Sequence, residues 1–436
     1  MNKTEYMNEL KQKLKKFGDE LQQEILDDYV QHFAEGEAAG KSDEEIMEEL
    51  GNIEDMIQEL GDAGETAPIT GAEAVPGRES EEKETLMVRT DDGTAGKKFS
   101  NIFLKTGSAN IVLKKSEDEW IHAKCLCEDG VSMDDIEFYQ YGEGDTFYAE
   151  IRQKDEYERK FSFYKTVVTV GKHFFPNGSG VTLVVKVPEG EERLKFETKS
   201  GNVRGESIGL KILEGATGSG DISLNSFAGS ETKLITASGD ISLNSFASSE
   251  TKLTTASGDI NLNSFASSKI QVITASGDIR MSKCAVEVLE AGTASGDVVF
   301  EGGACDEMAV KASSGDVSCS CSKIRNVKIF LSSGDVDLNI NAESCELSAS
   351  SGDICVTMEQ PPKRVKAHTC SGDISLELRN TENADVALRT RGGDISLRRG
   401  EEDIQVDDEG SYRHIFGSGD CEIKAETSQG DIDVQL

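Results

Sequence analysis

Aspartate is the residue whose spacing first suggests chemistry in this chain of 436 residues. It recurs in the tripeptide Ser-Gly-Asp, first at intervals of 19 residues and then more loosely, at Asp221, Asp240, Asp259, Asp278, Asp297, Asp316, Asp335, Asp353 and Asp373. If the repeats stack as coils, these carboxylates line up about 4.8 Å apart. Like charges at that distance repel by about 1 kcal/mol per pair in water, so something must offset the repulsion.

Two kinds of chemistry would offset it. In the first, each carboxylate accepts a backbone N–H of its own turn or of the next turn, and this structural interpretation is the one we favour. In the second, the nine aspartates and the turn carbonyls hold a row of cations, for which Ca²⁺ is the best match. A Ca²⁺ site usually takes two or more carboxylates, whereas each coil offers one here. We therefore expect no dedicated metal site and no cofactor, with a Ca²⁺ ladder as an alternative and recognition of the ladder by a partner as a third use.

A glycine precedes each of these aspartates. The nine turn glycines are Gly220, Gly239, Gly258, Gly277, Gly296, Gly315, Gly334, Gly352 and Gly372. Because glycine accepts a positive φ without steric cost, Ser-Gly is expected to form the turn between two strands.

The residues around each turn alternate with a period of two, which is typical of strands. An apolar pair such as Ile222 and Leu224 follows each aspartate, and a second apolar strand, with Leu234 in the first repeat, precedes the next turn. Phe227, Phe246, Phe265 and Cys284 share one phase, so they are expected to stack in a ladder inside the coil. The pattern predicts a mainly β fold, a single-stranded β-helix or β-solenoid with about 19 residues per coil, preceded by a small all-α bundle.

The composition divides the chain into five segments. Residues 201–400 are expected to form the regular solenoid with Ser-Gly-Asp turns. Residues 86–200, which hold the only tryptophan, are expected to form an N-terminal β cap and the first coils. Residues 401–436 are expected to form the C-terminal coils and cap, because an open coil end is an exposed sheet edge. Residues 63–85 are rich in Gly, Ala, Pro and Glu and predict a flexible acidic linker.

Residues 1–62 show helical periodicity, with Tyr6, Leu10 and Leu14 on one face and a capping box that begins at Ser42. Nineteen acidic and six basic residues occupy positions 1–65. A bundle of this size has little volume for an active site, so we expect it to dock a protein partner through a surface within 1–62.

Two resemblances follow from these motifs. The segments "MNKTEYMNELKQKL", "EILDDYVQHFAEGEAAGKSDEEI" and "ELGNIEDMIQEL" resemble the HAAS-type helical signalling domain of Firmicutes. That resemblance implies a non-catalytic adaptor associated with PadR-type transcription regulators. The repeats "GSGDISL", "ASGDIRM", "SSGDVSC" and "CSGDISLEL" resemble a bacterial "putative adhesin" β-strand-repeat family of unknown function, which implies a right-handed β-helix-like rod.

Net charge and cysteine content limit the partners and the cellular compartment that the chain can have. With 81 acidic and 46 basic residues the net charge is −35, which argues against nucleic acid and anionic lipid as partners. The start of the chain lacks an apolar signal-peptide core, and no stretch approaches the roughly 18 apolar residues of a membrane span. We therefore expect a cytoplasmic protein, or alternatively one that reaches the cell surface by a non-classical route. The ten cysteines, including the pairs Cys125/Cys127 and Cys319/Cys321, are expected to be reduced thiols that pack as small apolar side chains.

No arrangement of residues predicts catalysis. The five histidines are scattered, and neither a phosphate-binding loop nor a nucleophile elbow is present. The favoured hypothesis is a non-enzymatic cytoplasmic scaffold or adaptor in envelope-stress signalling, whose helical module docks a partner while the solenoid supplies a rigid surface. The alternatives are an adhesin-like protein that self-assembles through its solenoid, a cation-binding solenoid, and a carbohydrate enzyme of the pectate-lyase kind.

Overall fold

The computed structural model describes residues 3–15, 89–90, 97–128, 136–153, 180–400, 402–404, 406 and 410–436. Contacts divide the chain into two units. One comprises Met1–Lys83 and Gln153–Asn177, and the other comprises Glu84–Arg152 and Gly178–Leu436.

The described part of the first unit is essentially one helix, α1 (Lys3–Leu14). It contains Tyr6, Leu10 and Leu14, the first residues of the predicted helical pattern, and its Tyr6 is buried. Lys11 and Lys13 lie in the last turn, where the helix dipole favours positive charge. The other predicted helices of 1–62 and the predicted linker at 63–85 lie outside the described residues. Within the described ranges, no helix has the length and apolar character that crossing a membrane requires.

The second unit is built from strands. The first group is β1 (Arg89–Thr90), β2 (Asn101–Thr106), β3 (Asn110–Lys115), β4 (His122–Cys127), β5 (Ile136–Glu143), β6 (Thr146–Gln153), β7 (Val181–Val187), β8 (Glu191–Thr198) and β9 (Val203–Thr217). The central group is β10 (Ile222–Ala228), β11 (Glu231–Thr236), β12 (Ile241–Thr254), β13 (Ile260–Ile273), β14 (Ile279–Ser295), β15 (Val298–Ser314), β16 (Val317–Ser333) and β17 (Val336–Ser351). The last group is β18 (Ile354–Met358), β19 (Arg364–Ser371), β20 (Ile374–Leu378), β21 (Ala384–Arg389), β22 (Ile395–Arg399), β23 (Glu402–Ile404), β24 (Ser411–Phe416), β25 (Cys421–Glu426) and β26 (Ile432–Gln435).

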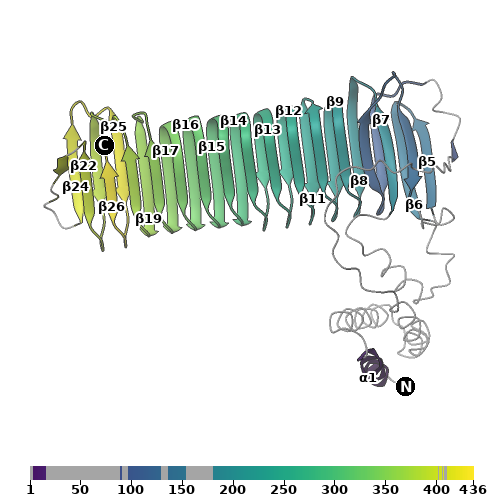
Figure 1. Cartoon of the computed structure of the whole chain (residues 1–436), viewed down its shortest axis with the longest axis horizontal. Coiled ribbons are helices and arrows are strands. Elements are labelled where there is room, and N and C mark those ends of the chain that lie inside the picture. The colour runs from purple at the N-terminus through teal and green to yellow at the C-terminus, as the bar shows by residue number, and fades with distance from the viewer. Residues whose placement is uncertain are drawn as a thin grey trace, which may run out of the picture. The chain divides into compact units, whose positions relative to one another are not determined.

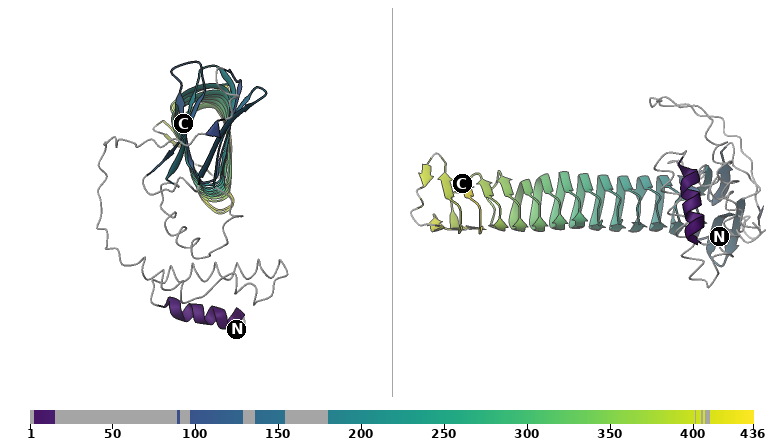
Figure 2. Two further views of the ribbon diagram at one scale, coloured as in Figure 1. Left: turned by 90° about the vertical axis from the view of Figure 1, so that its right-hand side faces the viewer. Right: turned by 90° about the horizontal axis from the view of Figure 1, so that it is seen from below.

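These strands form a β-solenoid of about ten coils with roughly 19 residues each, which confirms the predicted repeat (Figure 1). Successive coils pair in parallel and in register, so that Ile222 pairs with Ile241 and Ile241 with Ile260. Viewed along its axis, the solenoid is a flattened tube (Figure 2). The inward side chains of its strands form one buried hydrophobic core.

A ladder of aromatic rings fills the centre of the tube. The ring centroids of Phe227 and Phe246 are 4.4 Å apart at an interplanar angle of 15°, and those of Phe246 and Phe265 are 5.5 Å apart at 8°. Cys284 is fully buried and takes the corresponding place in the next coil. The predicted stack is therefore confirmed, and burying each of these phenylalanines contributes roughly 1.5–3 kcal/mol to stability.

A left-handed residue just before each phenylalanine bends the coil. The non-glycine residues with positive φ include Ser226, Ser245 and Ser264, at 56°, 51° and 52°. This conformation places two outward residues in a row, Asn225 and Ser226, so the strict alternation breaks and Phe227 still turns inward. The bend sets the outline of the coil's outer face.

Coils at the N-terminal end do not stack in chain order. Strand β2 lies between β6 and β8, and β3 lies between β7 and β9, so the first coil of the chain is sandwiched between two later ones. Antiparallel β4 covers the free side of β7. Residues 86–200 were predicted to form a β cap and first coils. The sequence did not predict that the first coil is inserted between two later coils.

The C-terminal end is inserted in the same way, and strands within 401–436 form both the inserted coil and the partners of the outermost coil. Strand β25 lies between β19 and β21, and β26 lies between β20 and β22. The last coil is therefore interior. The outermost coil consists of β21 and β22, and the antiparallel strands β24 and β23 pair with its two sides.

Candidate functional site

The turn aspartates form one continuous hydrogen-bond ladder. The backbone N–H of Asp240 donates to Oδ1 of Asp221 at 3.0 Å, and the N–H of Asp259 donates to Oδ1 of Asp240 at 2.8 Å. The same bond, 2.8 or 2.9 Å long, recurs at every step up to the bond from Asp373 N–H to Asp353. Each carboxylate thus uses one oxygen to hold the next turn.

The ladder continues past the regular coils at both ends. On one side, Asp221 N–H donates to the side-chain oxygen of Asn202 at 2.9 Å, and Asn202 N–H donates to that of Asn110 at 2.9 Å. On the other side, it runs from Asp373 to Asp431 and then to Asp394, following the inserted coil instead of chain order. Asparagine therefore serves as well as aspartate, because the bond needs an acceptor oxygen and not a charge.

This geometry limits what the ladder can do with cations. Oδ1 is occupied at each step, which leaves one carboxylate oxygen per coil. Two of the nine aspartates already form ion pairs with one guanidinium: Arg280 lies 2.5 Å from Asp278 Oδ2 and 3.5 Å from Asp259 Oδ2. In the part of the chain that the structure describes, no three His, Cys, Asp or Glu residues are placed to hold a metal ion.

The turn glycines are required mainly for close approach between coils, which differs from the expected reason. Gly220, Gly239, Gly258, Gly277 and Gly296 do not have positive φ, whereas Gly315, Gly334, Gly352 and Gly372 do, at 127–143°. In both groups a Cβ would clash with the backbone of the coil before. At Gly258 it would lie 2.0 Å from the carbonyl oxygen of Gly239, and at Gly334 it would lie 2.2 Å from that of Gly315.

The N–H of the turn glycine has two kinds of partner along the solenoid. At Gly220, Gly239, Gly258 and Gly277 it donates to the hydroxyl of the threonine three positions earlier, as in the 3.0 Å bond from Gly239 to Thr236. From Gly296 to Gly372 it donates to a backbone carbonyl of the next coil instead, as from Gly315 to Ser333 at 3.2 Å.

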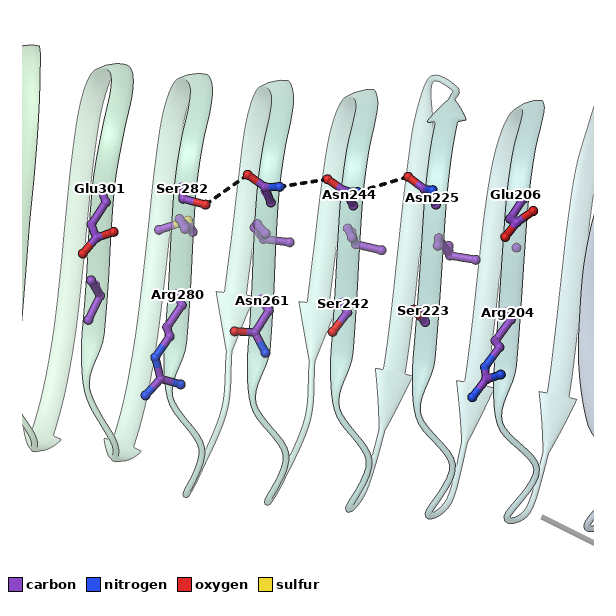
Figure 3. Close-up of a pocket in the computed structure, with 17 residues that line it drawn as sticks. Arg204, Glu206, Ser223, Asn225, Ser242, Asn244, Asn261, Arg280, Ser282 and Glu301 are labelled. Carbon is purple, nitrogen blue, oxygen red and sulfur yellow. Dashed lines mark hydrogen bonds between the residues drawn. The ribbon is translucent and has the colours of Figure 1, made fainter. Parts of the chain in front are cut away.

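A groove of about 830 Å³ lies on the outer face of the strands that follow these turns. Two rows of side chains, one residue from each coil, form its walls (Figure 3). The arginine row is Arg204, Ser223, Ser242, Asn261, Arg280 and Val299, and the amide row is Glu206, Asn225, Asn244, Asn263, Ser282 and Glu301. Inward residues such as Leu243 lie between the rows and form the floor. We call this feature the polar groove.

Hydrogen bonds between neighbouring coils order the amide row. Asn244 Nδ2 donates to Asn225 Oδ1 at 3.2 Å, Asn263 Nδ2 donates to Asn244 Oδ1 at 3.0 Å, and Ser282 Oγ donates to Asn263 Oδ1 at 3.1 Å. Each interior amide keeps one N–H and one oxygen lone pair for solvent or a ligand. Formal charges lie only toward the ends of the polar groove, at Arg204, Glu206, Arg280 and Glu301.

The chain matches two family models. The Toastrack DUF4097 model matches residues 99–299 and 272–435, which together span most of the chain. The chain belongs to the Toastrack DUF4097 family. The HAAS model matches residues 5–68, so both resemblances that the motifs suggested are confirmed. No curated protein matches this Toastrack chain.

Three solved structures are similar to this Toastrack chain at low identity. A "putative adhesin" from Bacteroides fragilis is 15% identical, with 53% of this chain and 93% of that chain covered and a TM-score of 0.32. A "putative cell adhesion protein" from Clostridium sporogenes is 9% identical, with 79% and 95% covered and a TM-score of 0.21. A "putative lipid binding protein" from Parabacteroides distasonis is 15% identical, with 64% and 89% covered and a TM-score of 0.22.

The cysteines of this Toastrack chain are all free. Seven are buried, Cys127 is half-buried, and Cys355 and Cys370 are exposed. Burial raises the pKa of Cys284 to about 11 and the pKa of Cys345 to about 12, so both thiols hold their protons at neutral pH. The Sγ atoms of Cys319 and Cys321 are 3.9 Å apart on one face of β16, as expected for a C-x-C pair on a strand.

Sequence reasoning found the aspartate ladder but missed the polar groove. The signal was available in "DISLNS", repeated at 221–226 and 240–245 and nearly so at 259–264, whose outward positions after the aspartate hold only Ser and Asn. In a chain with 29% charged residues, three consecutive coils without an outward charge at these positions form a distinct surface.

Proposed function

We propose that this Toastrack protein is a non-enzymatic cytoplasmic scaffold. In this proposal a surface within residues 1–62 docks a protein partner, and the β-solenoid presents a rigid surface. The observation that carries the proposal is the unbroken ladder from Asn110 to Asp394, which links successive coils along most of the solenoid and so gives a stiff, preorganised platform.

The helical module supports the docking role. Residues 5–68 match the HAAS family model, and the nineteen acidic and six basic residues of positions 1–65 favour a basic partner surface. By the family resemblance, we propose a PadR-type transcription regulator as the partner and envelope stress as the setting.

Co-purification from the native cell tests this role. The full chain is compared with a chain of residues 86–436, whose hydrophobic core runs from Phe99 to Leu436 without the helical module. A PadR-type regulator that is retained by the full chain and lost with 86–436 is the expected result. If 86–436 retains the same protein, or if the full chain retains none, the adaptor role is refuted.

A second candidate function is a surface or self-assembling adhesin-like protein. The neutral interior of the polar groove favours it, because a hydrogen-bonding surface without charges suits an uncharged polymer outside the cell. Fractionation of native cells distinguishes the two candidates: protein confined to the cytosol excludes the surface role, whereas protein in the wall fraction excludes the cytoplasmic scaffold.

A further inference from the structure

The polar groove has the form of a trough along the solenoid axis. Its two walls come from residues two apart in each strand, such as Ser242 and Asn244, and its length runs from the coil of Arg204 to that of Glu301. Five coil-to-coil steps of about 4.8 Å make this length roughly 24 Å. An open trough of this shape accommodates one extended chain better than a compact small molecule.

Side chains are the groups that a ligand meets in this trough. The backbone N–H and C=O groups of these strands are used between coils, as in the parallel pairing of Asn225 with Asn244 and of Asn244 with Asn263. A peptide lying along the axis would therefore find no free strand edge to extend. The available partners are hydroxyls and amides that repeat once per coil, and each offers both donors and acceptors.

The amide row is preorganised for binding. Hydrogen bonds on both sides of Asn244 hold its amide in one orientation, so little side-chain entropy is lost when a ligand binds. Each interior amide of the row still has one N–H and one oxygen lone pair that the hydrogen bonds within the row do not use. This pairing of a donor with an acceptor at a fixed repeat matches the hydroxyl groups of a sugar polymer.

The charges of the polar groove disfavour charged polymers as ligands. The walls contributed by the coils of Ser223, Ser242 and Asn261 carry no formal charge, and a carboxylate, Glu206 or Glu301, stands at either end of the amide row. In a chain of net charge −35 these carboxylates disfavour an anionic ligand. Arg204 on the opposite row disfavours a cationic one, whereas the charge of Arg280 is already paired with Asp259 and Asp278.

We propose that the polar groove binds a neutral, linear oligosaccharide along the solenoid axis. The hydroxyl and amide side chains of the coils from Ser223 to Ser282 hydrogen-bond its hydroxyls. This inference does not depend on the docking role of residues 1–62, so binding of oligosaccharide and retention of a regulator succeed or fail separately.

Titration calorimetry on the full chain tests the proposal, with cellohexaose and chitohexaose as neutral probes and a galacturonic acid hexamer as the anionic probe. The groove variant is Asn244→Ala, and the control is Asn339→Ala. Asn339 is exposed and holds the same position in its coil through the register Asn263, Ser282, Glu301 and Ser320, but it lies beyond the residues that line the groove. Melting curves confirm that both variants fold.

The expected result is that at least one neutral hexasaccharide binds, that Asn244→Ala weakens it about tenfold through lost hydrogen bonds, and that Asn339→Ala leaves it unchanged. Absence of binding by both neutral sugars overturns the proposal. Equal affinity in the two variants, or tighter binding of the galacturonic acid hexamer, also overturns it. A neutral Ser/Gly-rich peptide that binds more tightly than either sugar assigns the polar groove to a peptide instead.

Discussion

A single oxygen atom of each turn aspartate links one coil to the next. Asp316 illustrates this: its Oδ1 accepts the N–H of Asp335 at 2.9 Å, while its own N–H donates to Asp297. The bond satisfies a backbone donor at the turn and offsets the repulsion between stacked carboxylates. Asn202 performs the same role without a charge, which separates the contribution of the acceptor from that of the charge.

We predict that replacing Asp316 distinguishes these contributions. Both Asp316→Ala and Asp316→Asn remove two repulsive pairs, but only Asp316→Asn keeps an acceptor oxygen for Asp335 N–H. Asp316→Ala should therefore be less stable than Asp316→Asn by about 1 kcal/mol, and Asp316→Asn should be at least as stable as the parent. Urea unfolding followed by circular dichroism measures both. Equal stability of the two variants would show that the acceptor oxygen does not hold the turn.

The glycine before each aspartate is the second residue-scale constraint. We predict that Gly258→Ala destabilises the solenoid by about 1–3 kcal/mol, because the new Cβ would lie 2.0 Å from the carbonyl oxygen of Gly239 and the coils would have to separate. Gly292→Ala is the matched control, since its Cβ would lie 3.9 Å from the nearest atom, also a carbonyl oxygen. Melting temperatures test the pair, and a similar fall in both would refute the close-approach argument.

Two features of the elements shape the solenoid. The N–H of the turn glycine donates to a threonine hydroxyl up to Gly277 and to a carbonyl of the next coil from Gly296 on. The coil of β25 and β26 is inserted between two earlier coils, so each of its strands pairs with a strand on both sides. A terminal coil held on both sides cannot fray without breaking two interfaces.

We predict that deleting residues 419–436 disrupts more than the segment removed. Strands β21 and β22 then lose the coil that joins them to β19 and β20 and keep only β24 and β23 as partners. Limited proteolysis should cleave within residues 384–399 of the shortened chain and spare the same region of the full chain. Continued protection of this region in the shortened chain would show that its outer coil closes onto β19 and β20 directly.

At the scale of the whole solenoid, a continuous apolar column accommodates thiols beside aromatic and aliphatic side chains. Burial raises the pKa of Cys345 to about 12 from its ordinary value of 9.0. A thiol whose pKa is raised in the folded state stabilises that state below pH 9, and this stabilisation is lost as pH rises from 9 toward 12. The fold should therefore weaken at alkaline pH for a reason unrelated to its many carboxylates.

We predict that the melting temperature falls above pH 9 and that Cys345→Ala makes this fall less steep, although the cavity it leaves lowers the melting temperature at neutral pH. Cys370→Ala is the control, because Cys370 is exposed. Thermal melts from pH 7 to pH 11 compare the slopes. If Cys345→Ala and the parent lose stability equally between pH 9 and pH 11, the buried thiol does not govern the alkaline transition.

Local pattern in the chain was sufficient to predict the coil. Three features indicate which side chains face inward: the period of two at Ile222 and Leu224, the shared phase of Phe227 and Phe246, and the 19-residue step. The inward or outward direction of a side chain depends on its neighbours along the chain, so the sequence contains it. The positive φ of Ser226 was not predicted, because serine rarely adopts it and only closure of the tube imposes it. The helical bundle predicted for 1–62 is described only at α1 and remains a prediction beyond it.

The order of the coils and the polar groove depended on contacts between residues distant in sequence. Every Ser-Gly-Asp coil presents the same ladder above and below, so the repeats alone do not specify that Asp431 stacks between Asp373 and Asp394. Likewise, Ser242 and Asn244 are ordinary strand residues until five neighbouring coils align their counterparts into one trough. Stacking energies between whole coils, which no local window contains, determine both features.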